Sequence, residues 1–287
     1  MTTGYACLQG RGAVAAATLL LMCILVNQSL AASQSPWVDA MSSRARLVAG
    51  EDTPQGQLIG VHVELADNWK TYWRNPGDAG IPPLFDWKQS RNVASVKVLY
   101  PAPRRFGDPA GETIGYKHEV VFPVMVTRER PGEPAEVKLR FDYAVCAELC
   151  VPAQADLTLL LGPGTSSDIP SDLVSSFLAR VPQPASTTML PRLERLAKDG
   201  SGRQGRLTVD VMYAADAVDT DLFVEGPANW FLPLPRETSR DIDGAMQRVS
   251  YEISLADLPP TAQPDGQELT LTIVSGGAAV EQTAVIP

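Results

Sequence analysis

The residue types best suited to chemistry are Cys146 and Cys150, which are separated by three residues. On one regular β-strand, two positions spaced in this way lie about 13 Å apart, whereas a disulfide needs Cα atoms roughly 4.4–6.8 Å apart. One helical turn satisfies that limit, and so does a tight connection between two strands. Residues 138–145 alternate between apolar and polar side chains, and residues 155–159 return to a strand-like pattern. We therefore predict that the two cysteines close a turn between two β-strands.

The short loop between these cysteines favours a redox role over a structural one. In a chain-entropy model, a disulfide that closes about five residues stabilises a fold by roughly 2 kcal/mol, against about 4.7 kcal/mol for 100 residues. A bond that closes so short a loop is also easier to reduce. Glu148 lies inside the loop and no Lys, Arg or His flanks the pair, so nothing local stabilises a thiolate. These features predict an acceptor or relay that a partner's thiolate attacks, while a structural disulfide and a metal site stay open as alternatives.

The first 32 residues predict a cleaved secretory signal peptide. Arg11 is the only charged residue before Asp39, residues 13–26 are almost wholly apolar, and small residues follow at positions 29, 31 and 32. A transmembrane anchor is the alternative, but this apolar run is shorter than the roughly 20 residues that span a bilayer. Cleavage removes Cys7 and Cys23 and leaves only the central pair of cysteines. We expect the mature protein in the periplasm, where a disulfide is the default state of such a pair.

Charge and composition exclude several kinds of partner and site. Loss of residues 1–32 removes one positive charge, so the net charge of −9 becomes one unit more negative. Such an acidic protein is a poor candidate for binding nucleic acid or an anionic membrane surface, and no later segment is apolar and long enough for stable membrane insertion. No phosphate-cradling glycine loop occurs, so we expect no cofactor. His62 and His118 are the only histidines, and no serine- or cysteine-hydrolase signature is present.

The hydrophobic pattern predicts an all-β fold class. Short alternating segments, separated by Pro and Gly clusters, recur through residues 46–162 and indicate a β-sandwich. Residues 163–190 predict a linker with a short helix, and residues 191–287 predict a second, smaller β domain. The candidate strands lie at residues 45–50, 58–65, 70–74, 84–87, 93–100, 120–127, 137–145 and 157–161, and then at 206–212, 220–225, 248–255, 268–274 and 279–286.

Several sequence blocks carry a resemblance to a known family. They are YAVCAELCVP at 143–152, NWKTYWRNPGD at 68–78, PPLFDW at 82–87, YPAP at 100–103 and GY at 115–116. In this order they resemble the N-terminal periplasmic domain of the thiol:disulfide interchange protein DsbD, and most closely its version in the ScsB-type proteins linked to copper sensitivity. The blocks VEGP at 224–227 and WFLPLP at 230–235 also resemble the segment that comes after this domain in ScsB-type chains.

The resemblance implies an immunoglobulin-like sandwich in which Cys146 and Cys150 are the catalytic pair. Such a pair passes electrons to periplasmic thioredoxin-like proteins, in the manner of a protein-disulfide reductase. DsbD itself has a longer gap between its cysteines. This sequence also shows neither a membrane electron-transfer domain nor a terminal thioredoxin-like domain, so we expect a separate membrane protein of the DsbD/ScsB type to exchange electrons with it.

The same resemblance implies which other side chains line the site. In the family a cap loop shields the cysteines until a partner docks, and here this loop corresponds to about residues 106–116. The neighbouring strand at residues 70–74 is expected to lie beside the pair. The implied site-lining residues are Phe106, Ile114 or Tyr116 as the cover, and Tyr72 and Arg74 on the neighbouring strand.

Two other functions remain as alternatives. Sulfur and imidazole ligands suit copper(I), so His62 or His118 together with the cysteines could form a copper site in a copper-tolerance protein. The protein could also be a non-catalytic interaction module in which the disulfide is structural. The tryptophans at positions 69, 73, 87 and 230 are expected in cores and interfaces, not in a sugar-binding platform.

Overall fold

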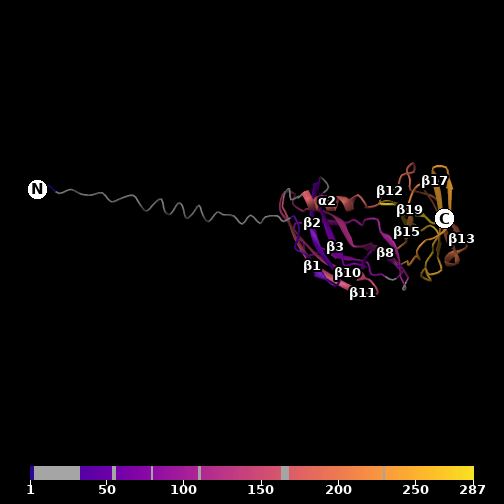
Figure 1. Cartoon of the computed structure of the whole chain (residues 1–287), viewed down its shortest axis with the longest axis horizontal. Helices are drawn as coiled ribbons and strands as arrows, with labels where there is room; N and C mark the ends of the chain where they lie inside the picture. Colours follow the sequence, from indigo (N-terminus) through magenta and orange to yellow (C-terminus); the bar gives the residue numbers. More distant parts are fainter. Residues whose placement is uncertain (3–32, 54–55, 79, 109–110, 163–167, 229) are drawn as a thin grey trace. The chain divides into compact units, whose positions relative to one another are not determined.

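The computed structural model describes residues 1–2, 33–53, 56–78, 80–108, 111–162, 168–228 and 230–287 (Figure 1). The predicted signal peptide, residues 1–32, lies outside the described residues except for its first two positions. Residues Ala32–Pro287 form one compact unit. Within the described ranges, no helix has both the length and the apolar character needed to cross a membrane.

Two antiparallel sheets form the first β-sandwich (Figure 1). One sheet has the order β1-β2-β3-β9-β6, and the other has the order β11-β10-β4-β8-β7, with β5 paired to β10. Along β11, buried and exposed side chains alternate almost perfectly, so one face of the strand enters the core and the other meets solvent. The strands span Val38–Ala40 (β1), Ser43–Thr53 (β2), Gly56–Leu65 (β3), Lys70–Gly77 (β4), Leu84–Asp86 (β5), Ser95–Val98 (β6), Arg104–Asp108 (β7), Gly111–Lys117 (β8), Glu119–Thr127 (β9), Ala135–Cys146 (β10) and Cys150–Leu161 (β11).

An aromatic cluster fills the centre of this sandwich. Phe122 on β9 and Phe141 on β10 are fully buried, and the ring of Phe85 lies 5.5 Å from the first and 4.9 Å from the second. The ring of Tyr143 stacks on Phe141 at 4.4 Å. Aromatic side chains bury large areas and lose little rotamer freedom, so this cluster gives β10 a rigid support up to the residues that precede the first cysteine.

A helix covers the outer face of the first sheet. α2 (Asp168–Leu178) contacts β2 and β9, and its residues Val174 and Phe177 belong to the same core. Gly60 on β3 permits the close approach, because a Cβ atom there would lie 2.9 Å from a Val174 methyl group and 2.5 Å from one of Val121. The helix in the segment predicted as a linker is therefore part of the packing of the first sandwich.

The C-terminal strands form a second β-sandwich with its own core. Its sheets have the orders β12-β19-β18-β15 and β13-β14-β17-β16, and apolar side chains of both sheets share one core, among them Val209, Ile253 and Leu271. The all-β fold class predicted from the sequence is confirmed, with one sandwich following another. The strands span Gln183–Pro184 (β12), Arg192–Asp199 (β13), Arg206–Ala214 (β14), Asp221–Glu225 (β15), Arg236–Asp243 (β16), Met246–Ser254 (β17), Glu268–Ser275 (β18) and Ala278–Val285 (β19), with a short 3₁₀ helix at Gly202–Gln204.

Candidate functional site

The two cysteines lie at the end of the long β10–β11 hairpin. Cys146 is the last residue of β10 and pairs in register with Cys150, the first residue of β11. A disulfide joins them, with the Cα atoms 4.1 Å apart. The backbone N–H of Ala147 donates to the carbonyl of Leu149 across the three-residue turn. The predicted turn between two strands is thus confirmed.

The two cysteine residues differ in their exposure to solvent. Cys146 is only 4% exposed, because it packs with Tyr72 and Ala144 on a strand that has β4 and β11 as neighbours. Cys150 is exposed, since β11 is the last strand of its sheet and the residue stands at the turn. Of the two residues, Cys150 is therefore the more open to a group arriving from solvent.

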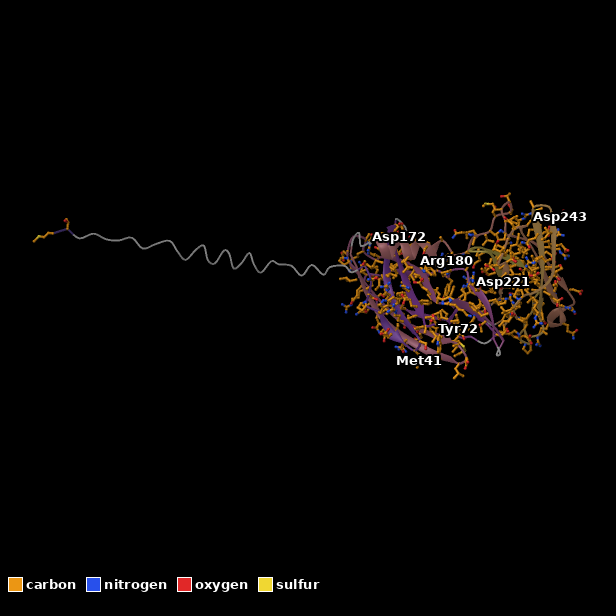
Figure 2. The ribbon with its side chains drawn as sticks, viewed as in Figure 1. Met41, Tyr72, Asp172, Arg180, Asp221 and Asp243 are labelled. Atoms are coloured by element: carbon orange, nitrogen blue, oxygen red, sulfur yellow. A yellow bond between two sulfur atoms is a disulfide. The ribbon has the colours of Figure 1, made fainter. Side chains whose placement is uncertain are left out.

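Tyr72 lies on β4 in the first sandwich (Figure 2), and its hydroxyl is in direct contact with the disulfide. Its side chain is 1% exposed, and its hydroxyl lies 3.0 Å from Sγ of Cys150. A disulfide sulfur carries no proton, so the hydroxyl donates this hydrogen bond. The hydroxyl of Thr71 donates to the carbonyl of Ala144 at 2.9 Å and ties β4 to β10. Of the predicted lining residues, Tyr72 is the one that touches a cysteine.

Gly80 holds the Tyr72 ring in place, although sequence reasoning did not single it out. A Cβ atom at Gly80 would lie 2.8 Å from two carbons of the ring and 2.4 Å from Cβ of Pro76. Only glycine allows the loop after β4 to lie so close to the ring. The signal available in the sequence is a glycine among turn-forming residues, which is common in any loop.

Phe106 shares the cysteine-bearing face of its sheet. Lys70 on β4 is in register with Cys146 on β10. Opposite residues of an antiparallel pair project from the same face of the sheet. The Lys70 ammonium group donates to the Thr113 hydroxyl at 2.7 Å and lies 6.0 Å from the centre of the Phe106 ring, while Lys117 lies 4.8 Å from it. Two strands, β4 and β8, separate β7 from the hairpin that carries the disulfide.

Ile114 and Tyr116 point the other way, into the sandwich core. Ile114 is fully buried, and the ring of Tyr116 packs 5.6 Å from Phe122. The Tyr116 hydroxyl donates to the carbonyl of Pro101 at 2.8 Å, and burial raises the pKa of Tyr116 well above its usual value. The segment expected as a cap loop is the β7–β8 hairpin, so the structure brings neither of these two side chains to the cysteines.

Arg74 also binds elsewhere, although it lies two residues beyond Tyr72. Its guanidinium group donates to Glu225 at 2.7 Å and to Glu281 at 2.5 Å, and both carboxylates belong to the second sandwich. Burial alone lowers the pKa of Arg74, but the hydrogen bonds and charges of the two glutamates outweigh burial and raise it. The residue connects the two sandwiches and does not line the disulfide.

The residues do not bring a metal site to the cysteines. Among the described residues, the group that could hold an ion is His62 with Glu64 and Glu119. Nδ1 of His62 accepts from the Arg46 side chain at 3.2 Å, so Nε2 carries the proton and faces Glu119 at 2.7 Å. Metal binding through Nε2 requires the proton on Nδ1 instead. The positive charge of Arg46 also disfavours a cation there, so the copper alternative gains no support.

Comparisons with known proteins agree with this geometry. Residues 42–162 match the family model described as thiol:disulfide interchange protein DsbD, N-terminal. The N-terminal periplasmic domain of ScsB from Proteus mirabilis matches with a TM-score of 0.67 at 21% sequence identity, over 88% of this chain and 98% of that chain. No curated protein matches. The family match confirms the resemblance over the first sandwich, and the structural match confirms the β-sandwich fold.

Proposed function

Because residues 42–162 match the DsbD N-terminal family, we propose that this protein relays electrons in the periplasm by thiol–disulfide exchange at Cys146 and Cys150. The observation that carries the proposal is the unequal exposure of one disulfide, with Cys150 open to solvent and Cys146 4% exposed. Exposure of Cys150 gives a partner thiol access to the disulfide, and burial of Cys146 protects that residue from competing thiols. The partners are periplasmic thioredoxin-like proteins and a membrane electron-transfer protein of the DsbD/ScsB type.

The exchange conserves atoms and electrons at each step. A partner thiolate attacks Sγ of Cys150, and a new disulfide forms as the Cys146–Cys150 bond breaks. The bonding electron pair leaves with Sγ of Cys146, which takes up a proton from water. A second partner thiolate then attacks the partner's own sulfur in the mixed disulfide and releases Cys150 as a thiolate. Two electrons have passed from the partner to the pair, and the reverse sequence passes them to an oxidised protein.

Tyr72 serves this reaction from the protein side. Its hydroxyl already donates to Sγ of Cys150 at 3.0 Å, and a hydrogen bond to a sulfur strengthens when the sulfur becomes a thiolate. The tyrosine therefore stabilises the thiolate that Cys150 carries when the mixed disulfide is resolved. Of the three cap candidates, Phe106 fits a covering role best, because its ring lies against Lys70, which pairs with Cys146.

Exposed apolar residues lie at the cysteine turn and in the segment after β4, and they suit a protein partner. Leu149 in the turn is 76% exposed, and Ile81 and Leu84 are 52% and 62% exposed. Leu84 pairs with Asp142 on β10, and Pro152, two residues after Cys150, is exposed as well. Apolar side chains gathered around a reactive group favour docking of a protein surface, and they contribute most of the affinity of such contacts.

Trapping of mixed disulfides in the periplasm tests the proposal. In the Cys146→Ser variant the free thiol of Cys150 attacks an oxidised partner, and no second cysteine resolves the product. In Cys150→Ser the remaining Cys146 is buried, so we expect much less trapping. Non-reducing electrophoresis and mass spectrometry after an acid quench identify the products, and the double Cys→Ser variant is the control. Equal trapping by both single variants, or trapping by neither, would contradict the proposal.

A further inference from the structure

The strands beside the disulfide are held by carboxylates of the second sandwich. β4 carries Tyr72 and Arg74, and β7 carries Arg105 next to Phe106. We use the name arginine brace for Arg74 and Arg105 together with the carboxylates that bind them. These carboxylates are Glu225, Glu281 and Asp221 of the second sandwich, and Glu112 on β8.

Arg74 makes the first half of the brace. Nε donates to both carboxylate oxygens of Glu225 at 3.0 Å, Nη2 donates to Glu225 at 2.7 Å, and Nη2 also donates to Glu281 at 2.5 Å. The guanidinium group lies 4.5 Å from the centre of the Trp73 ring, and Trp73 in turn contacts Phe223 of the second sandwich at 5.7 Å. Forked contacts of this kind restrain direction as well as distance, so β4 has little freedom to shift past β15.

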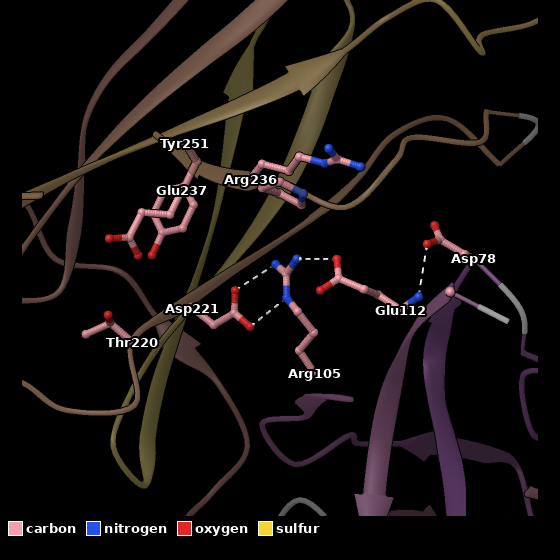
Figure 3. A pocket seen from close by; sticks show the side chains of 10 residues that line it. Asp78, Arg105, Glu112, Thr220, Asp221, Arg236, Glu237 and Tyr251 are labelled. Atoms are coloured by element: carbon pink, nitrogen blue, oxygen red, sulfur yellow. Dashed lines mark hydrogen bonds and ion pairs between the residues drawn. The ribbon is translucent and has the colours of Figure 1, made fainter. Parts of the chain in front are cut away.

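Arg105 makes the second half, as Figure 3 shows. Nε and Nη2 donate to the two oxygens of Asp221 at 3.1 Å and 2.8 Å, and Nη1 donates to Glu112 at 3.1 Å. The backbone N–H of Leu222 holds the Asp221 carboxylate from behind at 2.8 Å. On the other side, the backbone N–H of Glu112 donates to Asp78, just after β4. One chain of contacts thus runs from β15 through the β7–β8 hairpin to the end of β4.

Apolar packing joins the two sandwiches at Trp73 and Phe223, whereas open pockets adjoin the contacts of Arg105. Two cavities, of about 640 Å³ and 730 Å³, are both lined by Arg105, Thr220 and Asp221. Where side chains do not fill a junction, the polar contacts that cross it decide how the two parts are held. The polar contacts of the brace therefore add to the Trp73–Phe223 packing and hold the β7–β8 hairpin against β15.

We propose that the second sandwich belongs to the redox site, with Arg74 and Arg105 as positioning residues that keep the Tyr72 hydroxyl on Sγ of Cys150. This inference rests on the proposed function, since it gives the second sandwich a part in the same exchange reaction. When the brace is intact, Tyr72 stabilises the Cys150 thiolate. When the brace is broken, β4 and the hairpin relax and the thiolate loses this hydrogen bond.

The test measures the reactivity of Cys150 and uses no protein partner. In the chain from residue 33 to residue 287, which lacks Cys7 and Cys23, Cys146→Ser leaves Cys150 as the only cysteine. The rate of its alkylation by iodoacetamide is followed against pH, because only the thiolate reacts. Tyr72→Phe is expected to raise the pH midpoint and to lower the rate roughly tenfold at a fixed pH below the midpoint. The double change Glu225→Gln with Glu281→Gln, which alters only the second sandwich, is expected to raise the midpoint in the same direction. In a protein that already carries Tyr72→Phe, the double glutamate change should raise the pH midpoint little further, because the hydrogen bond it acts through is already lost.

Control variants separate positioning from a general loss of stability. Glu252→Gln removes an exposed ion pair with Arg206 on the second sandwich and leaves the midpoint unchanged. Asp221→Asn is expected to raise the pH midpoint, because it breaks the Arg105 half of the brace. It leaves the contacts of Arg74 in place. Near-ultraviolet circular dichroism verifies that every variant is folded.

Two results would overturn the inference. In the first, Tyr72→Phe raises the pH midpoint of alkylation, but neither Glu225→Gln with Glu281→Gln nor Asp221→Asn changes it. In the second, Tyr72→Phe itself leaves the midpoint unchanged. If no partner is trapped but the brace variants and Tyr72→Phe raise the pH midpoint as expected, the proposed function is rejected and the positioning role stands.

Discussion

The hairpins β10–β11 and β18–β19 are the same structural unit put to two uses. Each is a pair of antiparallel strands that contributes buried apolar residues to its sandwich. In the first sandwich the turn joins Cys146 to Cys150, whereas in the second a two-residue turn, Gly276 and Gly277, joins Ser275 to Ala278. The glycine turn only reverses the chain. The chemistry therefore comes from the residues at the turn and not from the β-sandwich itself.

The neighbours of the two hairpins also differ. β10 lies beside β4, which supplies the Tyr72 hydroxyl, while β18 lies beside β15, which supplies Asp221 and Glu225. β19 adds Glu281. The first hairpin thus carries the disulfide, while β15 and β19 supply carboxylates to Arg74 and Arg105 of the first sandwich. The second sandwich therefore contributes side chains to the first without a cysteine pair of its own.

The largest expected effect comes from the aromatic core of the first sandwich. Phe122→Ala removes a fully buried ring in contact with Phe85, Tyr100 and Tyr116, and we expect a loss of about 3–5 kcal/mol in the free energy of unfolding. Because Phe223 of the second sandwich belongs to the first core, urea unfolding followed by tryptophan fluorescence and circular dichroism should show one transition.

The exposed position Val285 on β19 provides the control, since Val285→Ala is expected to change stability by less than about 0.5 kcal/mol. Two separate transitions, with only the first shifted by Phe122→Ala, would show that the sandwiches are independent and would weaken the case for a brace between them.

A smaller effect is expected from the loop over Tyr72. Gly80→Val places a side chain against the Tyr72 ring and Pro76, and overpacking of this kind costs about 1–3 kcal/mol. The variant should also speed reduction of the disulfide by dithiothreitol, because a displaced loop exposes Cys146. The control is Gly277→Ala in the β18–β19 turn, where a Cβ atom meets nothing within 4 Å. Equal effects of the two substitutions on stability and reduction would contradict a specific role of the loop after β4 in covering Tyr72 and the disulfide.

The smallest expected effect is a pH dependence confined to the first sandwich, because both histidines lie there. Burial lowers the pKa of His62 despite the nearby Glu119 carboxylate, with Arg46 and Glu64 as further charged neighbours. Between this lowered value and the usual value of about 6.5, the unfolded state binds more protons than the folded state. The free energy of unfolding therefore rises with pH over that interval and falls as the pH drops through it.

His62→Gln should flatten this part of the stability profile, measured by urea unfolding in closely spaced buffers. His118→Asn is the control, since His118 is exposed and asparagine tolerates its positive φ of 66°. The prediction would be wrong if the pH slope of the free energy of unfolding persisted in His62→Gln and disappeared in His118→Asn, because His118 would then be its source.

Local patterns predict much of the fold and part of the site. The alternation before Cys146 and after Cys150 is enough to predict a turn closed by a disulfide, because both strands and the turn are adjacent in sequence. The alternation in β8 shows that Ile114 and Tyr116 share a face, but it does not say which face meets the core. That depends on the pairing of β8 with β4, whose residues lie far away in the chain. Both side chains are therefore plausible covers for the cysteines from sequence alone, and the structure places them in the core.

By itself the sequence determined that this is an all-β chain with one cysteine pair at a turn and a family resemblance in its first half. These features follow from periodicity, from turn residues and from spacing along the chain, which are local properties. Only the tertiary structure decided which sulfur is exposed, which hydroxyl contacts it, and that Arg74 binds Glu225 and Glu281 across 151 and 207 residues of sequence. The reason is physical: burial and ion pairing depend on which distant strands become neighbours, and no local pattern records that choice.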